Sequence, residues 1–477
     1  MTKQTVRTRF APSPTGYMHI GNLRTALYGY LYAKSQQGQF ILRIEDTDRT
    51  RYVADAVDFI NRTLEMAHIV PDESPSLGGP YGPYVQSERM DLYKKYAEEL
   101  VKTGHAYYCF CDPDEDHSAG KFGGYDRTCR NLAPEVIEEH LKNGDPYVIR
   151  QKMPLTGETT FFDVLHGNIT IKNEELEDQV LLKRDGMPTY NFANVVDDHL
   201  MGITHVIRGN EYLSSAPKYN LLYQAFGWDV PVYVHCSPVM KDKTHKLSKR
   251  NGDASFQDLL EKGYLPEAII NFIALLGWAP TGEQEIFTMD ELIQAFEISG
   301  ISKSPALFDP VKLKAINGEY IRKMTPEAFA EKAIPYIRQV VHSETADLQL
   351  LCHVLQPRTE LFTDIPEQVD FIDALPDYDV ELYRHKKMKT TPETAKEALT
   401  EILPVLEGIS DWTVDSIHAA VFARIGELGV KNGWMLWPLR TALSGKPFTP
   451  GGGIELCAIL GKDETLKRVQ DGINRLS

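Results

Sequence analysis

The sequence predicts an α/β fold built on a parallel sheet, followed by a region that is helical almost to the end of the chain. Three observations predict it. A strand-like stretch, an amphipathic helix and a second strand-like stretch succeed one another between residues 5 and 44, and the same order recurs between 204 and 240. After Phe256, apolar residues recur at helical spacing. Strand–helix–strand order favours parallel pairing, because a crossover helix returns the chain to the same edge of the sheet.

The first unit begins with residues 5–10, whose alternating pattern suits a strand, and a Pro/Gly loop follows at 11–16. A helix is expected from His19, and Gly38 marks its end before the strand 40–44. Its apolar positions repeat at helical spacing: Leu23, Ala26, Leu27, Tyr30 and Leu31.

An insertion is predicted to separate the two units. Residues 71–84 are rich in Pro and Gly and suit a surface loop, and residues 86–185 suit an inserted subdomain with short strands at 147–152 and 168–172. The α/β pattern resumes with a strand at 204–208.

The second unit continues with a helix that begins at Ser214 or Ser215 as N-cap and ends at Gly227. One strand is expected over 233–240. Prolines then separate the helices of the C-terminal region.

Composition excludes several classes of protein. With 477 residues, 42% hydrophobic and 25% charged, the chain is neither disordered nor fibrous. No run of about 18 apolar residues suggests a membrane span, and no signal peptide is evident, so a cytoplasmic protein without membrane contact is expected. The net charge of −16 opposes nucleic-acid binding overall, but residues 241–250 form a local basic patch that can bind a polyanion.

Two short motifs suit phosphate chemistry. His19-Ile-Gly21-Asn22 lies between a strand and a helix, where free backbone N–H groups and an imidazole can bind phosphate oxygens. Lys246 and Lys249, three positions apart, can neutralise a triphosphate. Taken singly, the first motif could be a capping loop with a surface histidine, and the second a solvated basic loop.

Together the two motifs resemble the signatures of class I aminoacyl-tRNA synthetases. Longer strings are similar to bacterial glutamyl-tRNA synthetases: 9–16 (RFAPSPTG), 42–49 (LRIEDTDR), 185–190 (DGMPTY), 193–199 (ANVVDDH) and 204–209 (THVIRG). Asn22 replaces the second histidine of the general signature, and Leu247 and Arg250 replace its Met and Ser; the family commonly varies there. The resemblance implies a Rossmann-like catalytic domain with an inserted acceptor-binding subdomain, followed by an all-α anticodon-binding region.

The resemblance implies a glutamate pocket. Arginines would bind the carboxylates and Glu45 the ammonium group, although residues 45–49 could also form a loop of mutually paired charges. The implied pocket residues are Arg9, Ser13, Glu45, Tyr190, Asn194 and Arg208.

The resemblance also implies an ATP site and a two-step reaction through glutamyl-adenylate, with Mg²⁺ accompanying ATP. His19, Lys246 and Lys249 would be catalytic, stabilising the α-phosphate in the transition state and the departing pyrophosphate. The residues implied near ATP are His19, Gly21, Asn22, Glu211, Tyr212 and Lys249.

Three cysteines cluster within 21 positions. Cys109, Cys111 and Cys129, with Tyr125 or His117 as a fourth ligand, could bind one structural Zn²⁺, as in some relatives of this family. The alternative to a zinc site is that the three cysteines are reduced thiols in a small subdomain.

The resemblance implies a domain organisation. The catalytic domain would comprise 1–85 and 186–240, the acceptor-stem-binding insertion 86–185, the signature loop and helical connecting domain 241–322, and the helical anticodon-binding region 323–477. Arg358 lies where an arginine can read the anticodon.

The implied partners are tRNA(Glu), L-glutamate and ATP, for a monomer in the cytoplasm. A non-discriminating enzyme that also charges tRNA(Gln), and an inactive tRNA-binding paralogue, remain alternatives. An enzyme that glutamylates a tRNA base would lack the C-terminal region, and a glutaminyl-tRNA synthetase would typically carry a β-barrel there. The helical pattern after Phe256 disfavours both.

Overall fold

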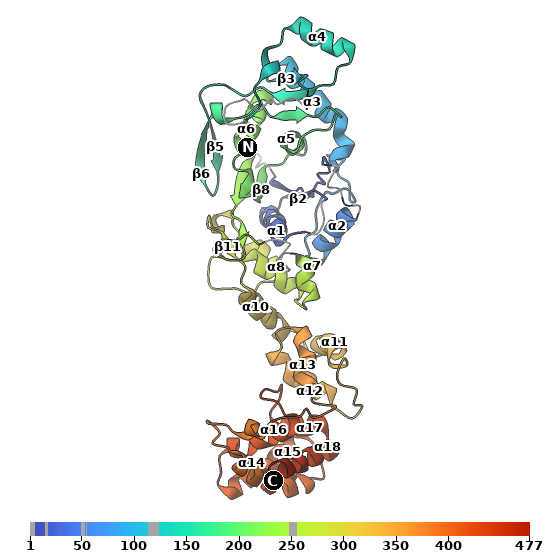
Figure 1. Cartoon of the computed structure of the whole chain (residues 1–477), viewed down its shortest axis with the longest axis vertical. Helices are drawn as coiled ribbons and strands as arrows, with labels where there is room; N and C mark the ends of the chain where they lie inside the picture. The colour runs from blue at the N-terminus through green and yellow to red at the C-terminus, as the bar shows by residue number, and fades with distance from the viewer. Residues whose placement is uncertain (1–4, 15–17, 49–52, 54, 113–123, 248–254) are drawn as a thin grey trace. The chain divides into compact units, whose positions relative to one another are not determined.

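The computed structural model describes residues 5–14, 18–48, 53, 55–112, 124–247 and 255–477. The chain divides into two compact units (Figure 1). The N-terminal unit comprises Met1–Leu260 and Ile269–Asp309, and the C-terminal unit comprises Glu261–Ala268 and Pro310–Ser477.

Two strand–helix–strand units form the centre of the N-terminal unit, as the sequence predicts. They comprise β1 (Arg7–Phe10), α1 (Ile20–Ser35) and β2 (Gln39–Leu42), then β8 (His205–Gly209), α6 (Ala216–Phe226) and β9 (Val232–Cys236). β1 pairs with β2 and β8 with β9, both in parallel. The Thr204 N–H donates to the Arg7 carbonyl at 2.9 Å, which brings the start of β8 alongside β1.

The second unit departs from prediction in two details. The expected strand 233–240 is divided into β9 and β10 (Val239–Met240), and β10 pairs with β11 (Ala306–Leu307). Pro238 lies between them and has no N–H with which to continue a ladder. Ser215 occupies the N-cap position of α6, but its side chain makes no capping hydrogen bond.

A hairpin within 86–185 joins the central strands. It comprises β5 (Glu158–Asp163) and β6 (Gly167–Lys172), and β5 pairs in parallel with β9 where Asp163 faces Tyr233. The strand order is β6-β5-β9-β8. A separate antiparallel sheet contains β3 (Ala106–Cys109), β4 (Val148–Gln151) and β7 (Val180–Leu182). The strand-like runs 147–152 and 168–172 therefore correspond to β4 and β6.

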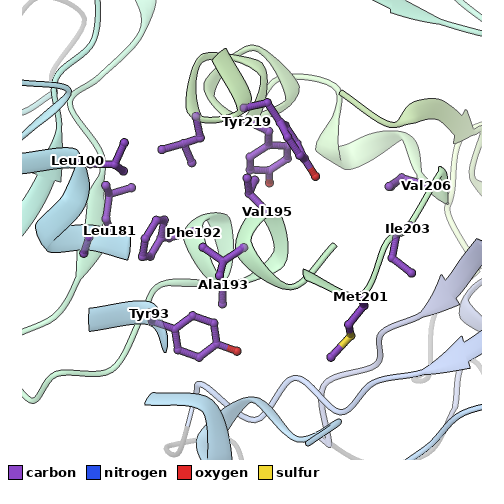
Figure 2. Close-up of a cluster of buried hydrophobic side chains, with 14 of the residues drawn as sticks. Tyr93, Leu100, Leu181, Phe192, Ala193, Val195, Met201, Ile203, Val206 and Tyr219 are labelled. Atoms are coloured by element: carbon purple, nitrogen blue, oxygen red, sulfur yellow. The ribbon is translucent and has the colours of Figure 1, made fainter. Parts of the chain in front are cut away.

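A buried apolar cluster fixes the helix α5 (Tyr190–Leu200), which carries two candidate site residues. Figure 2 shows Phe192, Ala193 and Val195 of α5 between Leu100 and Leu181 on one side and Ile203 and Val206 on the other. Burying an aliphatic or aromatic side chain contributes roughly 1.5–3 kcal/mol, so this cluster holds α5 firmly. The other helices of residues 56–295 are α2 (Ala56–Met66), α3 (Met90–Lys102), α4 (Pro134–Asn143), α7 (Phe256–Glu261), α8 (Pro266–Ala274) and α9 (Met289–Ala295).

The C-terminal unit is built of helices, as expected. Arg468 is almost fully buried there and donates to the carbonyls of Phe371, Ile372 and Leu443 at 2.7–2.8 Å, which ties three segments together. Among the described residues, no helix combines the length and apolarity needed to cross a bilayer. The helices are α10 (Pro310–Arg322), α11 (Pro326–Ile337), α12 (Leu348–Leu355), α13 (Ile365–Val369), α14 (Pro392–Glu407), α15 (Val414–Leu428), α16 (Asn432–Ser444), α17 (Gly453–Leu460) and α18 (Lys462–Arg475).

Candidate active site

Two adjoining cavities open at the carboxyl ends of β1 and β8. The larger, here called cavity A, has a volume of about 390 Å³, and the smaller, cavity B, about 290 Å³. Asn22, Thr25, Gly209 and Glu211 line both. Cavity A is also lined by Arg9, Phe10, Ala11, Pro12, Ser13, Thr47, Asp48, Tyr190, Ile207, Arg208 and Tyr212. Cavity B is also lined by His19, Gly21, Arg24, Cys236, Ser237, Pro238, Val239, Lys246 and Leu247.

His19 caps α1 with its own ring. Its Nδ1 accepts the Gly21 N–H at 3.0 Å, so a neutral ring carries its proton on Nε2, which donates to the Leu247 carbonyl at 3.0 Å. A Cβ at position 21 would lie 3.3 Å from Nδ1, which explains the glycine. The two short motifs therefore meet at one cavity. Lys246 lines it, whereas Lys249 lies outside the described residues.

Arg9 and Glu45 belong to one buried network of charges. Asp198 accepts from Arg9 Nε and Nη2 at 3.2 Å each, and from Arg43 Nη1 at 2.8 Å. Arg43 Nη2 also donates to Glu45 Oε1 at 2.8 Å. Burial raises the pKa of Asp198, but the two arginines outweigh it and hold the pKa below its ordinary value. The motif strings contain Arg43 and Asp198, but sequence reasoning gave them no role, because contacts 155 and 189 residues apart leave no local signal.

Glu45 and Asn194 lie behind the surface of cavity A. Neither is among the described residues that line it. Glu45 is buried, and its Oε2 has no hydrogen-bond partner within the described parts of the chain. Burial raises the pKa of Glu45 despite its pairing with Arg43. Asn194 donates to the Tyr190 carbonyl at 2.7 Å, which directs its amide to its own helix.

Arg208 is a cation at cavity A for which the described residues supply no anionic partner. It is buried at the end of β8, and its Nη2 has no hydrogen-bond partner among the residues that the structure describes. The rings of Tyr212, Tyr219 and Tyr233 surround the guanidinium, with centroids 4.8, 4.9 and 5.7 Å from Cζ. Because an arginine stays charged when buried, such a site favours a carboxylate ligand.

Tyr190 and Tyr212 form one aromatic wall of cavity A. Their rings stack with centroids 5.2 Å apart. Burial, and next the charge of Glu45, raises the pKa of Tyr190 well above its ordinary value, so its hydroxyl stays protonated and can donate a hydrogen bond. Cavity A thus combines two arginines, an aromatic wall and hydroxyl groups, which suits a small dicarboxylate with a polar body.

The cysteine cluster forms as the sequence predicts. The Sγ atoms of Cys109, Cys111 and Cys129 lie within 4.8 Å of one another, and Tyr125 Oη lies 3.2 Å from Sγ of Cys109 and of Cys111. Arg150 stacks on the Tyr125 ring at 3.7 Å and lies 3.4 Å from Cys109 Sγ. Three converging sulfurs beside a cation suit a thiolate-bound metal. His117 lies outside the described residues.

Arg358 lies at a separate cavity in the C-terminal unit. This cavity C has a volume of about 1060 Å³. Arg358 Nη1 donates to the carbonyls of Thr449, at 3.0 Å, and Pro450. Arg440 lies over the Trp437 ring at 4.2 Å, and Phe448 is 85% exposed at the rim. Stacked aromatic and guanidinium planes are typical of sites that bind unpaired bases. Sequence analysis did not single out Trp437, Arg440 or Phe448; a phenylalanine between Pro447 and Pro450 was the available signal.

Comparisons with known proteins agree with this architecture. The model described as "tRNA synthetases class I (E and Q), catalytic domain" matches residues 5–315, and an anticodon binding domain matches 328–473. A glutamate–tRNA ligase of Clostridium acetobutylicum is 58% identical over 483 residues and covers 100% of both chains. This chain belongs to the glutamate–tRNA ligases. The ligase of Clostridium novyi is 59% identical, covering 100% of this chain and 99% of its own.

Solved structures of other glutamate–tRNA ligases share the fold. The ligase from Elizabethkingia meningosepticum, crystallised in complex with its amino acid, superposes with a TM-score of 0.88 at 37% identity, covering 99% of this chain and 100% of its own. The enzyme from Elizabethkingia anophelis gives 0.87 at 36% identity with the same coverage. The expected Rossmann-type class I catalytic domain and helical anticodon-binding region are thereby confirmed for this ligase.

Proposed function

We propose that this ligase activates L-glutamate with ATP and transfers it to the 3′ end of tRNA(Glu). The observation that carries the proposal is Arg208, a buried guanidinium at cavity A with an unpartnered Nη2 and no carboxylate at ion-pair distance among the described residues. Burying a charge without a partner is costly, so the site is built for an anionic ligand. The side-chain carboxylate of glutamate supplies that anion.

Cavity A would bind glutamate. Arg208 and Arg9 would bind carboxylates, and the unpartnered Oε2 of Glu45 would accept a hydrogen bond from the substrate ammonium after a side-chain rotation toward the cavity. Tyr190 would donate its hydroxyl. The proposed glutamate-binding residues are Arg9, Ser13, Glu45, Tyr190, Asn194 and Arg208.

Cavity B and the wall that it shares with cavity A would bind ATP together with Mg²⁺. His19 would exchange its Leu247 hydrogen bond for one from Nε2 to the α-phosphate, and the lysines would neutralise the departing pyrophosphate. His19, Lys246 and Lys249 would be the catalytic residues. The proposed ATP-binding residues are His19, Gly21, Asn22, Glu211, Tyr212 and Lys249.

The reaction would proceed by an in-line substitution at phosphorus and then by addition and elimination at a carbonyl carbon. An α-carboxylate oxygen of glutamate attacks the α-phosphorus of ATP, the bond to the β-phosphate oxygen breaks, and pyrophosphate leaves. The 2′-hydroxyl of the terminal adenosine then attacks the carbonyl carbon of glutamyl-adenylate, loses its proton, and AMP leaves. The enzyme would act by positioning and charge stabilisation, without a covalent enzyme intermediate.

The cysteine cluster would bind one structural Zn²⁺ through Cys109, Cys111, Cys129 and Tyr125. The donor set fits, because three soft sulfurs and one oxygen meet zinc's preference for four ligands. The ion would tie Tyr125 and Cys129 to β3, which contributes Cys109.

Cavity C would bind anticodon bases, with Arg358 among the residues that read them. The proposal keeps the domain boundaries inferred above: 1–85 and 186–240 catalytic, 86–185 binding the acceptor stem, 241–322 connecting, and 323–477 binding the anticodon. The enzyme would be a monomer in the cytoplasm. Sedimentation of the purified enzyme tests the monomeric state through the mass that it gives.

Glutamate-dependent pyrophosphate exchange, with purified tRNA(Glu) or tRNA(Gln), tests the function. Exchange with tRNA(Glu) alone supports a discriminating ligase, and exchange with both supports an enzyme that also charges tRNA(Gln). Folded protein that gives no exchange with either tRNA, in the presence of Mg²⁺, would overturn the proposal in favour of an inactive tRNA-binding protein.

A further inference from the structure

A buried chain of three polar side chains leads away from cavity A behind Arg208. Arg208 Nε donates to His235 Nε2 at 3.1 Å, and His235 Nδ1 lies 2.8 Å from Asp163 Oδ2. Asp163 and His235 are both fully buried. Three residues from β8, β9 and β5 therefore form one line across three neighbouring strands.

The hydrogen bonds determine the protonation of His235. Arg208 Nε can only donate, so His235 Nε2 must accept, and the single proton of a neutral ring then lies on Nδ1 and points to Asp163. Burial lowers the pKa of His235 to about 4, and the hydrogen bond to Asp163 opposes that shift only in part. The ring is therefore neutral at pH 7.

Asp163 is held in place by the backbone. Its Oδ1 accepts the N–H groups of Leu165 and His166 at 2.9 Å each, and its Oδ2 accepts the His235 N–H at 3.0 Å. Although burial raises the pKa of Asp163, the hydrogen bond from the His235 ring and those from the backbone of His166 and Leu165 keep it below its ordinary value. The carboxylate is thus charged and immobile, which fixes the plane and tautomer of the imidazole that it contacts.

The other arginine of cavity A is anchored differently. Asp198 pairs directly with two nitrogens of Arg9, so much of that positive charge is already compensated inside the protein. Arg208 instead contacts a neutral ring, and within the described part of the chain its carboxylate anchor, Asp163, is reached only through that ring. The imidazole orients Nε of Arg208. It does not compensate the positive charge at the Nη edge, where Nη2 is unpartnered among the described residues.

We propose that His235 is a positioning residue that anchors Arg208 without neutralising it. This inference rests on the proposed glutamate site. An arginine held by a neutral acceptor keeps its full attraction for a carboxylate. Its remaining N–H groups can only donate hydrogen bonds, so the arginine disfavours the NH₂ group of a carboxamide, which is also a donor. His235, with Asp163 behind it, thereby strengthens glutamate binding and the preference for glutamate over glutamine.

Three substitutions at one position separate orientation from charge. His235→Gln retains a neutral acceptor and should keep the Michaelis constant for glutamate within about threefold, whereas His235→Phe removes the acceptor and should raise it at least about tenfold. His235→Glu places a carboxylate directly on Arg208 and should raise the constant at least as much as His235→Phe, although it retains an acceptor. The Michaelis constants for ATP and tRNA should not change, and the preference for glutamate over glutamine should fall in the last two variants.

Controls distinguish this inference from the function on which it rests. His199→Gln changes a histidine that stacks on Trp228 away from both cavities and should leave all constants unchanged. If Arg208→Gln leaves the Michaelis constant for glutamate unchanged, the proposed glutamate site is wrong. If Arg208→Gln raises it but His235→Phe and His235→Glu do not, only the role of His235 is overturned.

A measurement on the unchanged enzyme tests the inference even if only one of the variants His235→Gln and His235→Phe folds. Nitrogen-15 NMR of the histidine side chains should find His235, assigned by its loss in His235→Gln or His235→Phe, protonated on Nδ1 and unprotonated on Nε2 at pH 7. An Nε2–H tautomer or an imidazolium would overturn the inference, because neither can accept a hydrogen bond from Arg208.

Discussion

His19 Nε2 and the Leu247 carbonyl oxygen are 3.0 Å apart, although 228 residues separate them in the sequence. This hydrogen bond joins the N-cap residue of α1 to Leu247, which directly follows Lys246. It places the histidine and the first lysine on the wall of one cavity, where a nucleotide phosphate can contact both. The proposed catalytic roles of His19 and Lys246 depend on this convergence.

If Lys249 has the proposed role of stabilising developing phosphate charge, Lys249→Ala should lower tRNA-dependent adenylate formation by at least about tenfold. Pyrophosphate exchange at saturating glutamate measures it. Lys243→Ala is the matched control: Lys243 is an exposed lysine of the same segment that does not line cavity B. A loss of less than about threefold would contradict the assigned phosphate role.

Asp198→Asn should lower the free energy of unfolding by about 3–5 kcal/mol, because the substitution leaves Arg9 and Arg43 buried with less negative charge. Urea denaturation followed by tryptophan fluorescence measures the change. Asp229→Asn is the control, since Asp229 is an exposed carboxylate and its loss should hardly matter. Equal stability of the two variants would show that the network around Asp198 is not a stabilising one.

The stability of the N-terminal unit should fall as the pH decreases from about 6.5 toward 4. An unfolded histidine binds a proton near pH 6.5, whereas His235 in the folded state resists protonation until its pKa of about 4. The unfolded state therefore binds more protons over this interval, and acid favours unfolding. The lowered pKa of Asp163 adds to the loss at still lower pH. His235→Gln should flatten the dependence of urea midpoints on pH between 7 and 5; an unchanged slope would exclude His235 as its source.

Cys129→Ser should remove zinc from the purified ligase, since three cysteines share one site with Tyr125. Metal analysis of protein prepared without added zinc should find about one equivalent in the unchanged enzyme and far less in the variant. Cys352→Ala, a buried cysteine of the C-terminal unit, should retain the metal. Less than about a tenth of an equivalent in the unchanged enzyme would reject the site.

Arg358→Gln should weaken discrimination among anticodon variants of tRNA(Glu) at one base, by about 1–3 kcal/mol in the ratio of kcat/KM values. Arg358 lies at the rim of cavity C, held by the carbonyls of residues 449 and 450. Arg424→Gln, on α15 and paired with Glu401 and Glu427, is the control. Identical kinetics of the Arg358 variant on all tRNA variants would exclude its role in reading the anticodon.

The sequence by itself determined the features that depend on local pattern. The pattern of residues 5–44 and 204–240 predicted two strand–helix–strand units, and Gly227 ended α6 in the left-handed conformation that glycine adopts easily. The spacing of Cys109, Cys111 and Cys129 indicated a common site. The division of the expected strand at Pro238 could have been predicted from the sequence, because proline has no N–H with which to continue the hydrogen bonds of a sheet.

Only the tertiary structure decided which charges meet. Asp198 joins Arg9 and Arg43 across more than 150 residues, and β5 places Asp163 beside β9, where it contacts His235. Sequence pattern does not reveal such pairs, because the Coulomb and hydrogen-bond energies that define them depend on distances set by strand order and register. The resemblance carried by the sequence therefore predicted Arg208 as a site residue, but only the fold brought His235 within hydrogen-bond distance of it.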